Sequence, residues 1–125
     1  MSQNDRGSAS VESLGVSVLV TLITLAILQF AVVAHIRAVV VDSAIAGAAF
    51  ASLADSTLAA GIERTHYLLD IGVAADLVES VSGRTSTVAG RPVRVVTVGY
   101  RVPAFALWVP SVRDEVSARA FVERP

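Results

Sequence analysis

Apolar and polar residues are patterned differently in successive parts of the chain, and the longest apolar run comes first. From Ser13 to Ala34 no residue is charged, and most are Leu, Val, Ile, Ala or Phe. As a helix rising about 1.5 Å per residue, these roughly 22 residues reach about 33 Å, enough to cross a hydrocarbon core. The pattern predicts a transmembrane helix. A buried helix of a soluble protein is the alternative, but such helices are rarely apolar for so long.

The helical pattern continues past this run. Residues 38–54 are rich in alanine, and Gly47 is the only helix breaker among them. A helix that is apolar on nearly every side is normally buried on every side, and small residues let other backbones approach closely. We therefore predict that the same helix extends through 38–54 and packs on its own C-terminal domain, on neighbouring subunits, or on both.

One or two short helices are predicted next. Asp55-Ser56-Thr57 is typical of a helix start. Two sets of positions then recur at helical spacing: Leu58, Ile62, Thr65 and Leu69, followed by Ala74, Leu77, Val78 and Val81. Gly83 is placed to cap the end of the second set.

Beyond Gly83 the pattern favours strands. Thr85–Val88 and Val93–Val102 are rich in β-favouring residues, and Ala89–Pro92 between them predicts a turn. The last segment alternates, with one face formed by Val116, Ala118, Ala120 and Val122. Together these segments predict a small antiparallel sheet of about three strands. The expected fold class is therefore α+β with a membrane anchor.

The composition and the remaining polar residues offer no active site. Cysteine is absent, which excludes disulfides, thiol nucleophiles and Cys-type zinc sites. The net charge is −1 and no arginine cluster forms a stripe along the sequence, so we expect no nucleic-acid binding. His35 and His66 lie in no metal-ligand spacing, and Glu63 and Asp70 beside His66 are more typical of a solvated helix face. No catalytic motif appears, and we predict no enzyme, no cofactor and no small-molecule substrate.

The most informative motif stands just before the apolar run. It reads Arg6-Gly7-Ser8-Ala9-Ser10-Val11-Glu12. A lone carboxylate at the edge of a membrane helix is costly if it sinks into lipid, although the helix dipole favours it at the N-terminal end. An ordinary interfacial Glu is the simpler interpretation of Glu12.

The same arrangement resembles the type III signal of type IV prepilins, in which a short polar leader ends in Gly and Glu is the fifth mature residue. The resemblance implies that a prepilin peptidase cuts after Gly7, so that Ser8 begins the mature chain. Glycine has no Cβ, which lets its peptide lie flat in a membrane-embedded cleft. The new ammonium of Ser8 in one subunit would pair with Glu12 of the next and favour one register between their helices.

Within this group the layout is most similar to the TadE-like pseudopilins of tight-adherence (Flp) pilus systems, in a short actinobacterial form. The motif content lies in residues 1–55, and the rest matches in architecture alone. Three positions depart from the family pattern: Ser8 replaces the Phe or Met of major pilins, Ser13 stands where Phe or Tyr often follows the Glu, and Gly15 is present where many members have a Pro in the membrane helix.

The resemblance implies four parts: a leader at 1–7, a transmembrane helix at 8–37, its extension at 38–54 and a small extracytoplasmic α+β domain at 55–125. The expected function is that of a minor pilin-like subunit of a pilus or secretion filament. Its N-terminus would be cytoplasmic and its C-terminal domain would lie outside the plasma membrane or at the cell surface. Its partners would be the membrane, the prepilin peptidase and other pilin-like subunits, contacted through the N-terminal helix.

Two other outcomes remain open from the sequence. Val32-Val33-Ala34 has the small-residue pattern that signal peptidase accepts, and cleavage after Ala34 would release a secreted extracellular binding or effector protein. Alternatively, the chain is never cleaved and serves as a single-pass accessory membrane protein.

An apolar connection lies between Pro103 and Pro110, where a polar loop is expected. Its large side chains include Phe105, Leu107 and Trp108. The segment either covers the sheet as part of the core or forms a patch for a partner or for lipid headgroups.

Overall fold

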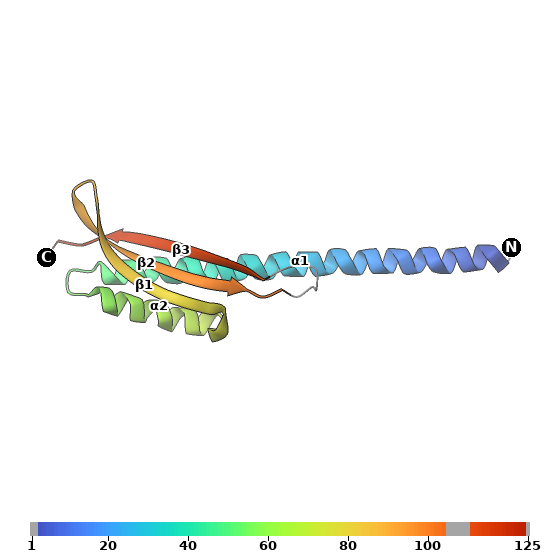
Figure 1. Ribbon diagram of the computed structural model, residues 1–125, viewed down its shortest axis with the longest axis horizontal. Coiled ribbons are helices and arrows are strands. Elements are labelled where there is room, and N and C mark those ends of the chain that lie inside the picture. Colours follow the sequence, from blue (N-terminus) through green and yellow to red (C-terminus); the bar gives the residue numbers. More distant parts are fainter. Residues whose placement is uncertain (1–2, 105–110, 125) are drawn as a thin grey trace. The chain divides into compact units, whose positions relative to one another are not determined.

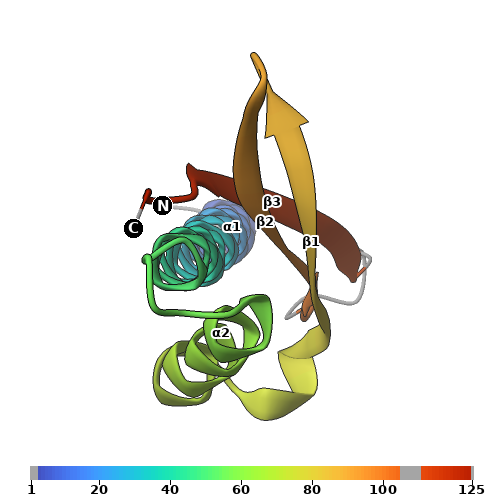
Figure 2. The same ribbon diagram turned by 90° about the vertical axis from the view of Figure 1, so that its left-hand side faces the viewer.

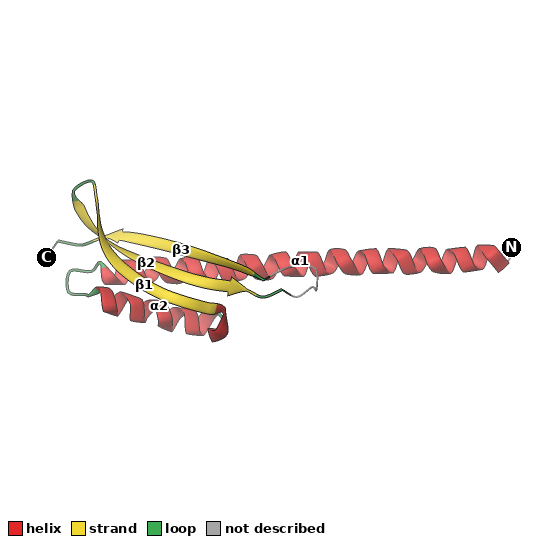
Figure 3. Ribbon diagram, in the orientation of Figure 1, coloured by secondary structure: helices red, strands yellow, loops and turns green. Residues whose placement is uncertain are grey.

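The computed structural model describes residues 3–104 and 111–124. The chain forms two compact units, Met1–Val32 and Val33–Pro125. The elements follow in the order α1 (Gln3–Ala51), α2 (Leu58–Gly72), the 3₁₀ turn η1 (Ala75–Leu77), β1 (Val78–Val88), β2 (Arg91–Val102) and β3 (Val112–Phe121) (Figures 1 and 3). The predicted α+β class, with one long helix and three antiparallel strands, is confirmed.

The described residues of the first unit belong to α1, and none from Arg6 to Val32 is buried. All residues from Arg6 to Leu28 are exposed. Large apolar side chains such as Leu14 (65 % exposed) and Phe30 (74 % exposed) stand on every side of the helix. This part of α1 therefore has no core of its own, and its apolar surface is left for surroundings other than the chain itself.

The second unit has two layers, with helices on one face of a three-stranded sheet (Figure 2). The part of α1 beyond Val33 buries a stripe at a spacing of four residues: Ile36, Val40, Ala44 and Ala48. On α2 the buried residues are Gly61, Thr65 and Leu69, again four apart. The sheet contributes its central strand, where Val96 and Val98 are fully buried. These positions form the core of the molecule.

Glycine brings the two helices of this unit into close contact. A Cβ at Gly47 would overlap the Thr65 hydroxyl and lie 2.9 Å from the carbonyl oxygen of Gly61. A Cβ at Gly61 would in turn overlap Ala51. The prediction that the small residues of 38–54 pack on the chain's own domain is thus confirmed for this face.

The start of α2 follows the sequence signal. Thr57 is the N-cap, and its side chain accepts a hydrogen bond from the Ala60 backbone N–H at 3.1 Å. The preceding helix ends at Ala51, three residues before the predicted end. There the Ser52 carbonyl accepts a hydrogen bond from the backbone N–H of Glu123 at 2.8 Å, outside the helical ladder.

Of the one or two short helices predicted, the first is α2, and the second does not form as predicted. Of that set, only Leu77 lies in a helical turn, whereas Val78 and Val81 belong to β1. Pairing with β2 overrides the helical spacing: the register shifts between Val78 and Ser80, as at a β-bulge, and the β-branched Val78 and Val81 suit a strand. Gly83 is therefore not a helix cap. It lies within β1, where its missing Cβ leaves room for Leu58 and Ile62 of α2.

The sheet has the order β1-β2-β3, and both pairs are antiparallel. Ala89 and Gly90 connect β1 to β2 with positive φ angles of 51° and 76°, as a tight two-residue hairpin requires. The predicted turn is in place but shorter than expected, because Arg91 and Pro92 already belong to β2. In the register of the sheet, Val95 lies opposite Arg84 on one side and Arg119 on the other.

Candidate processing and assembly site

The predicted processing residues lie near the beginning of α1. Gly7, Ser8 and Glu12 are all helical and exposed, and a Cβ at Gly7 would meet nothing within 4 Å. The nearby Ser10 hydroxyl donates to the Arg6 carbonyl at 3.1 Å. A peptidase acting here would need to unwind only the first turns of a helix, where fraying is easiest.

Ser8 and Glu12 share one face of the helix because they are four residues apart. A new amino group at Ser8 would therefore lie one turn from the Glu12 carboxylate of its own chain. The Glu12 carboxylate could then pair with the Ser8 amino group of its own chain or with that of a neighbouring chain.

The hydroxyl groups of the apolar run bond to their own helix. Ser17 donates to the Ser13 carbonyl at 2.9 Å, Thr21 to Ser17 at 2.8 Å and Thr24 to Val20 at 2.8 Å. These bonds remove the hydroxyl donors from the outer surface of the run, which makes that surface more apolar than its composition suggests.

By length and composition, α1 is able to cross a membrane. The helical span Arg6–Ala51 is long and apolar enough for this, and its most apolar stretch is not buried among the described residues. A single membrane span and an N-terminal signal anchor both meet this description, and the exposure of that stretch sets it apart from a buried core helix.

The remaining candidate residues do not assemble into a chemical site. His35 is exposed on α1, and Glu63, His66 and Asp70 are exposed on α2 without an ion pair among the described residues. Across residues 3–104 and 111–124 no group of three His, Asp or Glu side chains could hold a metal ion. The apolar patch predicted at Phe105, Leu107 and Trp108 lies outside the described residues.

A polar cluster that the sequence did not reveal joins α1 to β3. Arg37 forms a salt bridge with Asp114, and the Tyr100 hydroxyl donates to the same carboxylate at 3.1 Å. The backbone N–H of Glu115, the Tyr100 hydroxyl and Arg37 lower the pKa of Asp114. Burial, followed by the hydrogen bond to Asp114, raises the pKa of Tyr100. Arg37 and Asp114 are 77 positions apart, so no local pattern could have paired them.

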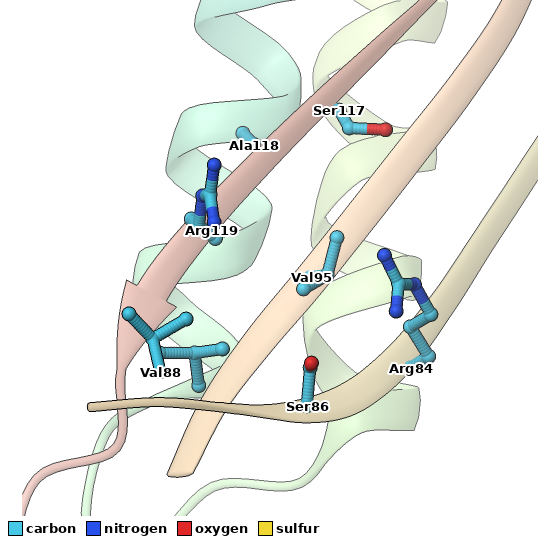
Figure 4. Close-up of a pocket in the computed structure, with 8 residues that line it drawn as sticks. Arg84, Ser86, Val88, Val95, Ser117, Ala118 and Arg119 are labelled. Atoms are coloured by element: carbon cyan, nitrogen blue, oxygen red, sulfur yellow. The ribbon is translucent and has the colours of Figure 1, made fainter. Parts of the chain in front are cut away.

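A second unforeseen feature lies on the face of the sheet that α2 does not cover. Figure 4 shows Arg84 from β1 and Arg119 from β3 on either side of Val95, with hydroxyls at Ser86 and Ser117 nearby. Together they line a depression of about 160 Å³. Both arginines are exposed, and neither side chain has a hydrogen bond or ion pair within the described part of the chain.

Comparisons with models of known protein families, with curated proteins and with solved structures gave no match for this chain.

Proposed function

We propose that the protein is a minor pilin-like subunit of the TadE-like type, processed after Gly7 and held in the plasma membrane by α1. Its role is assembly and not catalysis: it joins other pilin-like subunits to build or prime a tight-adherence type pilus or secretion filament. The N-terminus lies in the cytoplasm, and the unit from Val33 to Pro125 lies outside.

One observation carries the proposal. Gly7 precedes Glu12 by five residues at the head of a helix whose next residues are exposed, uncharged and apolar on all sides. A polar leader, a processing glycine, a lone carboxylate and an unbroken apolar rod in this order are the parts that a prepilin needs. An interfacial Glu alone would not require the glycine at that distance.

The internal hydroxyl bonds of the apolar run support the membrane part of the proposal. In lipid, every polar group of the segment must be satisfied by the segment or by a neighbouring helix. Ser17, Thr21 and Thr24 meet this condition through their own backbone. The only carboxylate near the run is Glu12, which is left for a positively charged partner at the membrane edge.

Release by signal peptidase after Ala34 is the second candidate, and one observation favours it. The folded unit begins at Val33, and its first buried side chain is Ile36. Cleavage after Ala34 would therefore leave the whole core in the released piece, which could act as a secreted binding or effector protein.

The mature N-terminus distinguishes the candidates. We expect mass spectrometry of the protein from cell envelopes to give a chain that starts at Ser8. Gly7→Ala is expected to retain the leader, whereas the matched change Gly15→Ala, at a glycine that is equally uncrowded, should leave processing unchanged. A chain starting at His35 in the culture medium would establish secretion instead. An intact Met1 in wild type and both variants would identify an unprocessed accessory protein.

Assembly is tested separately from processing. Glu12→Gln keeps the shape of the side chain and removes its charge, so we expect normal cleavage but loss of incorporation into filaments. Asp55→Asn, at an exposed carboxylate far along the sequence from the membrane run, is the control for a general effect of lost charge. Normal incorporation of the Glu12→Gln chain would exclude the proposed pairing with the amino group of Ser8.

A further inference from the structure

Charge is distributed unevenly between the layers of the folded unit. Residues 33–77, which form the helices, contain two Arg against five Asp and Glu, a net charge of −3. Residues 78–125, which include the sheet, contain seven Arg against four Asp and Glu, a net charge of +3. A unit with one acidic and one basic layer attracts another copy of itself in one orientation.

The basic layer presents a defined surface, which we call the arginine groove and which consists of Arg84, Val95 and Arg119. Arg84 and Arg119 each pair in register with Val95, so they stand two strand spacings apart, or about 10 Å at the backbone. Val95 is 6 % exposed, so little of its side chain is accessible between the two arginines (Figure 4). Neither arginine has an ionic partner among the described residues of its own chain.

The acidic layer presents a surface of matching dimensions on α2, which we call the acidic face and which consists of Glu63, Tyr67 and Asp70. Glu63 and Asp70 are seven residues apart, or about 10.5 Å along the helix axis, and Tyr67 lies between them on the same side. Tyr67 is 56 % exposed, with the Arg64 guanidinium 5.5 Å from its ring centroid, and both carboxylates are exposed and without an ion pair within the described chain.

The two surfaces point away from each other within one molecule. The Cβ position of Gly83 faces Leu58 and Ile62 of α2, so the next residue, Arg84, faces the opposite side of the sheet. The acidic face is the side of α2 opposite its buried residues Thr65 and Leu69. The arginine groove therefore cannot contact the acidic face of its own copy, but it can contact the acidic face of a second copy.

We propose that the folded unit associates head to tail, with the acidic face of one copy seated in the arginine groove of the next. The two carboxylates pair with the two guanidinium groups, and Tyr67 lies over Val95 between them. The helix crosses the strands in this arrangement, because its charges are spaced along its axis while the arginines are spaced across the sheet. A pair joined in this way keeps one free surface of each kind, so the contact can repeat and build an open chain of subunits.

This inference goes beyond the proposed function and does not depend on processing at Gly7, because both surfaces lie in the second unit. It is tested with the full chain in vesicles of phosphatidylcholine, a lipid without net charge. The chain has no Cys, so Ser111→Cys, at an exposed position, provides one site for donor and acceptor dyes. Energy transfer between labelled copies then measures association.

Two charge-reversed variants are expected to associate weakly when each is alone and normally when they are mixed. Arg84→Glu with Arg119→Glu makes both surfaces acidic, and Glu63→Arg with Asp70→Arg makes both surfaces basic. Each protein alone is expected to associate at least about tenfold more weakly than wild type, since like charges now meet. An equimolar mixture should recover association, because each surface finds an opposite charge on the other protein.

Two further measurements serve as controls. Arg124→Glu with Asp55→Arg changes exposed charges outside both surfaces and should leave association unchanged. Raising NaCl to 0.5 M should weaken wild-type association, because exposed charges are screened. Failure of the mixture to recover energy transfer would overturn the proposal. A second outcome would also overturn it: the Arg84→Glu, Arg119→Glu protein self-associates normally but no longer binds phosphatidylglycerol vesicles. The two arginines would then bind anionic lipid headgroups and not a second copy.

Discussion

The two parts of α1 are made of similar amounts of apolar residue and yet meet different surroundings. Between Arg6 and Leu28 every residue is exposed, and the side chains are mostly Leu, Ile, Val and Thr. Between Val33 and Ala51 a stripe is buried, and its closest contacts are made by Ala and Gly. Hydropathy therefore does not distinguish a helix that packs on protein from one that does not; side-chain size does, because close packing of helices requires small residues.

The largest effect is expected from placing a charge in the first part. Under the proposed membrane span, Leu22→Arg raises the apparent free energy of insertion by about 3 kcal/mol, since Arg is costly near the centre of a bilayer. We expect most of this variant to be lost from the carbonate-resistant membrane fraction. Ala49→Arg, at an exposed position in the second part, is the matched control and should remain in that fraction. Equal membrane retention of both variants would mean that the first part does not span the bilayer.

A slightly smaller effect is expected from filling the helix crossing. Gly47→Ala places a Cβ against the Thr65 hydroxyl and the Gly61 carbonyl, so we expect the free energy of unfolding to fall by about 2 kcal/mol despite the better helix propensity of Ala. Gly15→Ala meets nothing within 4 Å and should not lower it. Thermal unfolding of the detergent-solubilised chain, followed by circular dichroism, makes the measurement. If the two variants unfold alike, the close crossing is not present.

Replacing one valine by alanine in each part of α1 tests the same difference between a packed and an unpacked helix surface. Val40 is fully buried, so Val40→Ala should lower the free energy of unfolding by about 1–2 kcal/mol through lost packing. Val20 is 56 % exposed, and Val20→Ala should leave the unfolding of the second unit unchanged. The same thermal measurement applies. A cost at Val20 equal to that at Val40 would indicate that the first part also has a packing partner.

The smallest effect on stability is expected from the polar cluster of Arg37, Tyr100 and Asp114, at the start of the second part of α1. Because the pKa of Asp114 is lowered in the folded chain, its contribution to stability is present above its ordinary pKa of 3.8 and is lost as the pH falls through the folded-state value. The pair is exposed, so Asp114→Asn should cost less than about 1 kcal/mol at pH 7 and make stability less sensitive to acid below about pH 4. Unfolding curves at pH 3 and pH 7 compare the two proteins. Equal acid sensitivity would show that the cluster contributes nothing.

Local signals in the sequence identified most of the elements. The cap at Thr57, the hairpin at Ala89 and Gly90 and the uninterrupted first helix depend on nearby residues alone, and each was predictable. The segment around Val78 and Val81 was not, because its apolar residues recur at helical spacing and only pairing with β2 makes it a strand. Long-range pairing lies outside any local pattern.

The candidate functional residues likewise fall into those that local sequence could predict and those that it could not. Gly7 and Glu12 could be identified because their meaning depends on spacing along the chain. The arginine groove could not, because Arg84 and Arg119 are 35 positions apart and become neighbours only through the register of three strands. Antiparallel pairing gathers like charges that look scattered in the sequence.

The glycine-lined crossing of α1 and α2 also has a consequence for the order of folding. Gly47, Gly61 and Ala51 lose almost no rotamer freedom when they meet, and the loop that connects the two helices is short. We expect this helical hairpin to form early, since it loses little side-chain entropy at the crossing and closes only a short loop. The hydrogen bond from the Glu123 backbone to Ser52 joins the end of the chain to the same loop, so this closure can occur only after the whole sheet has been synthesised.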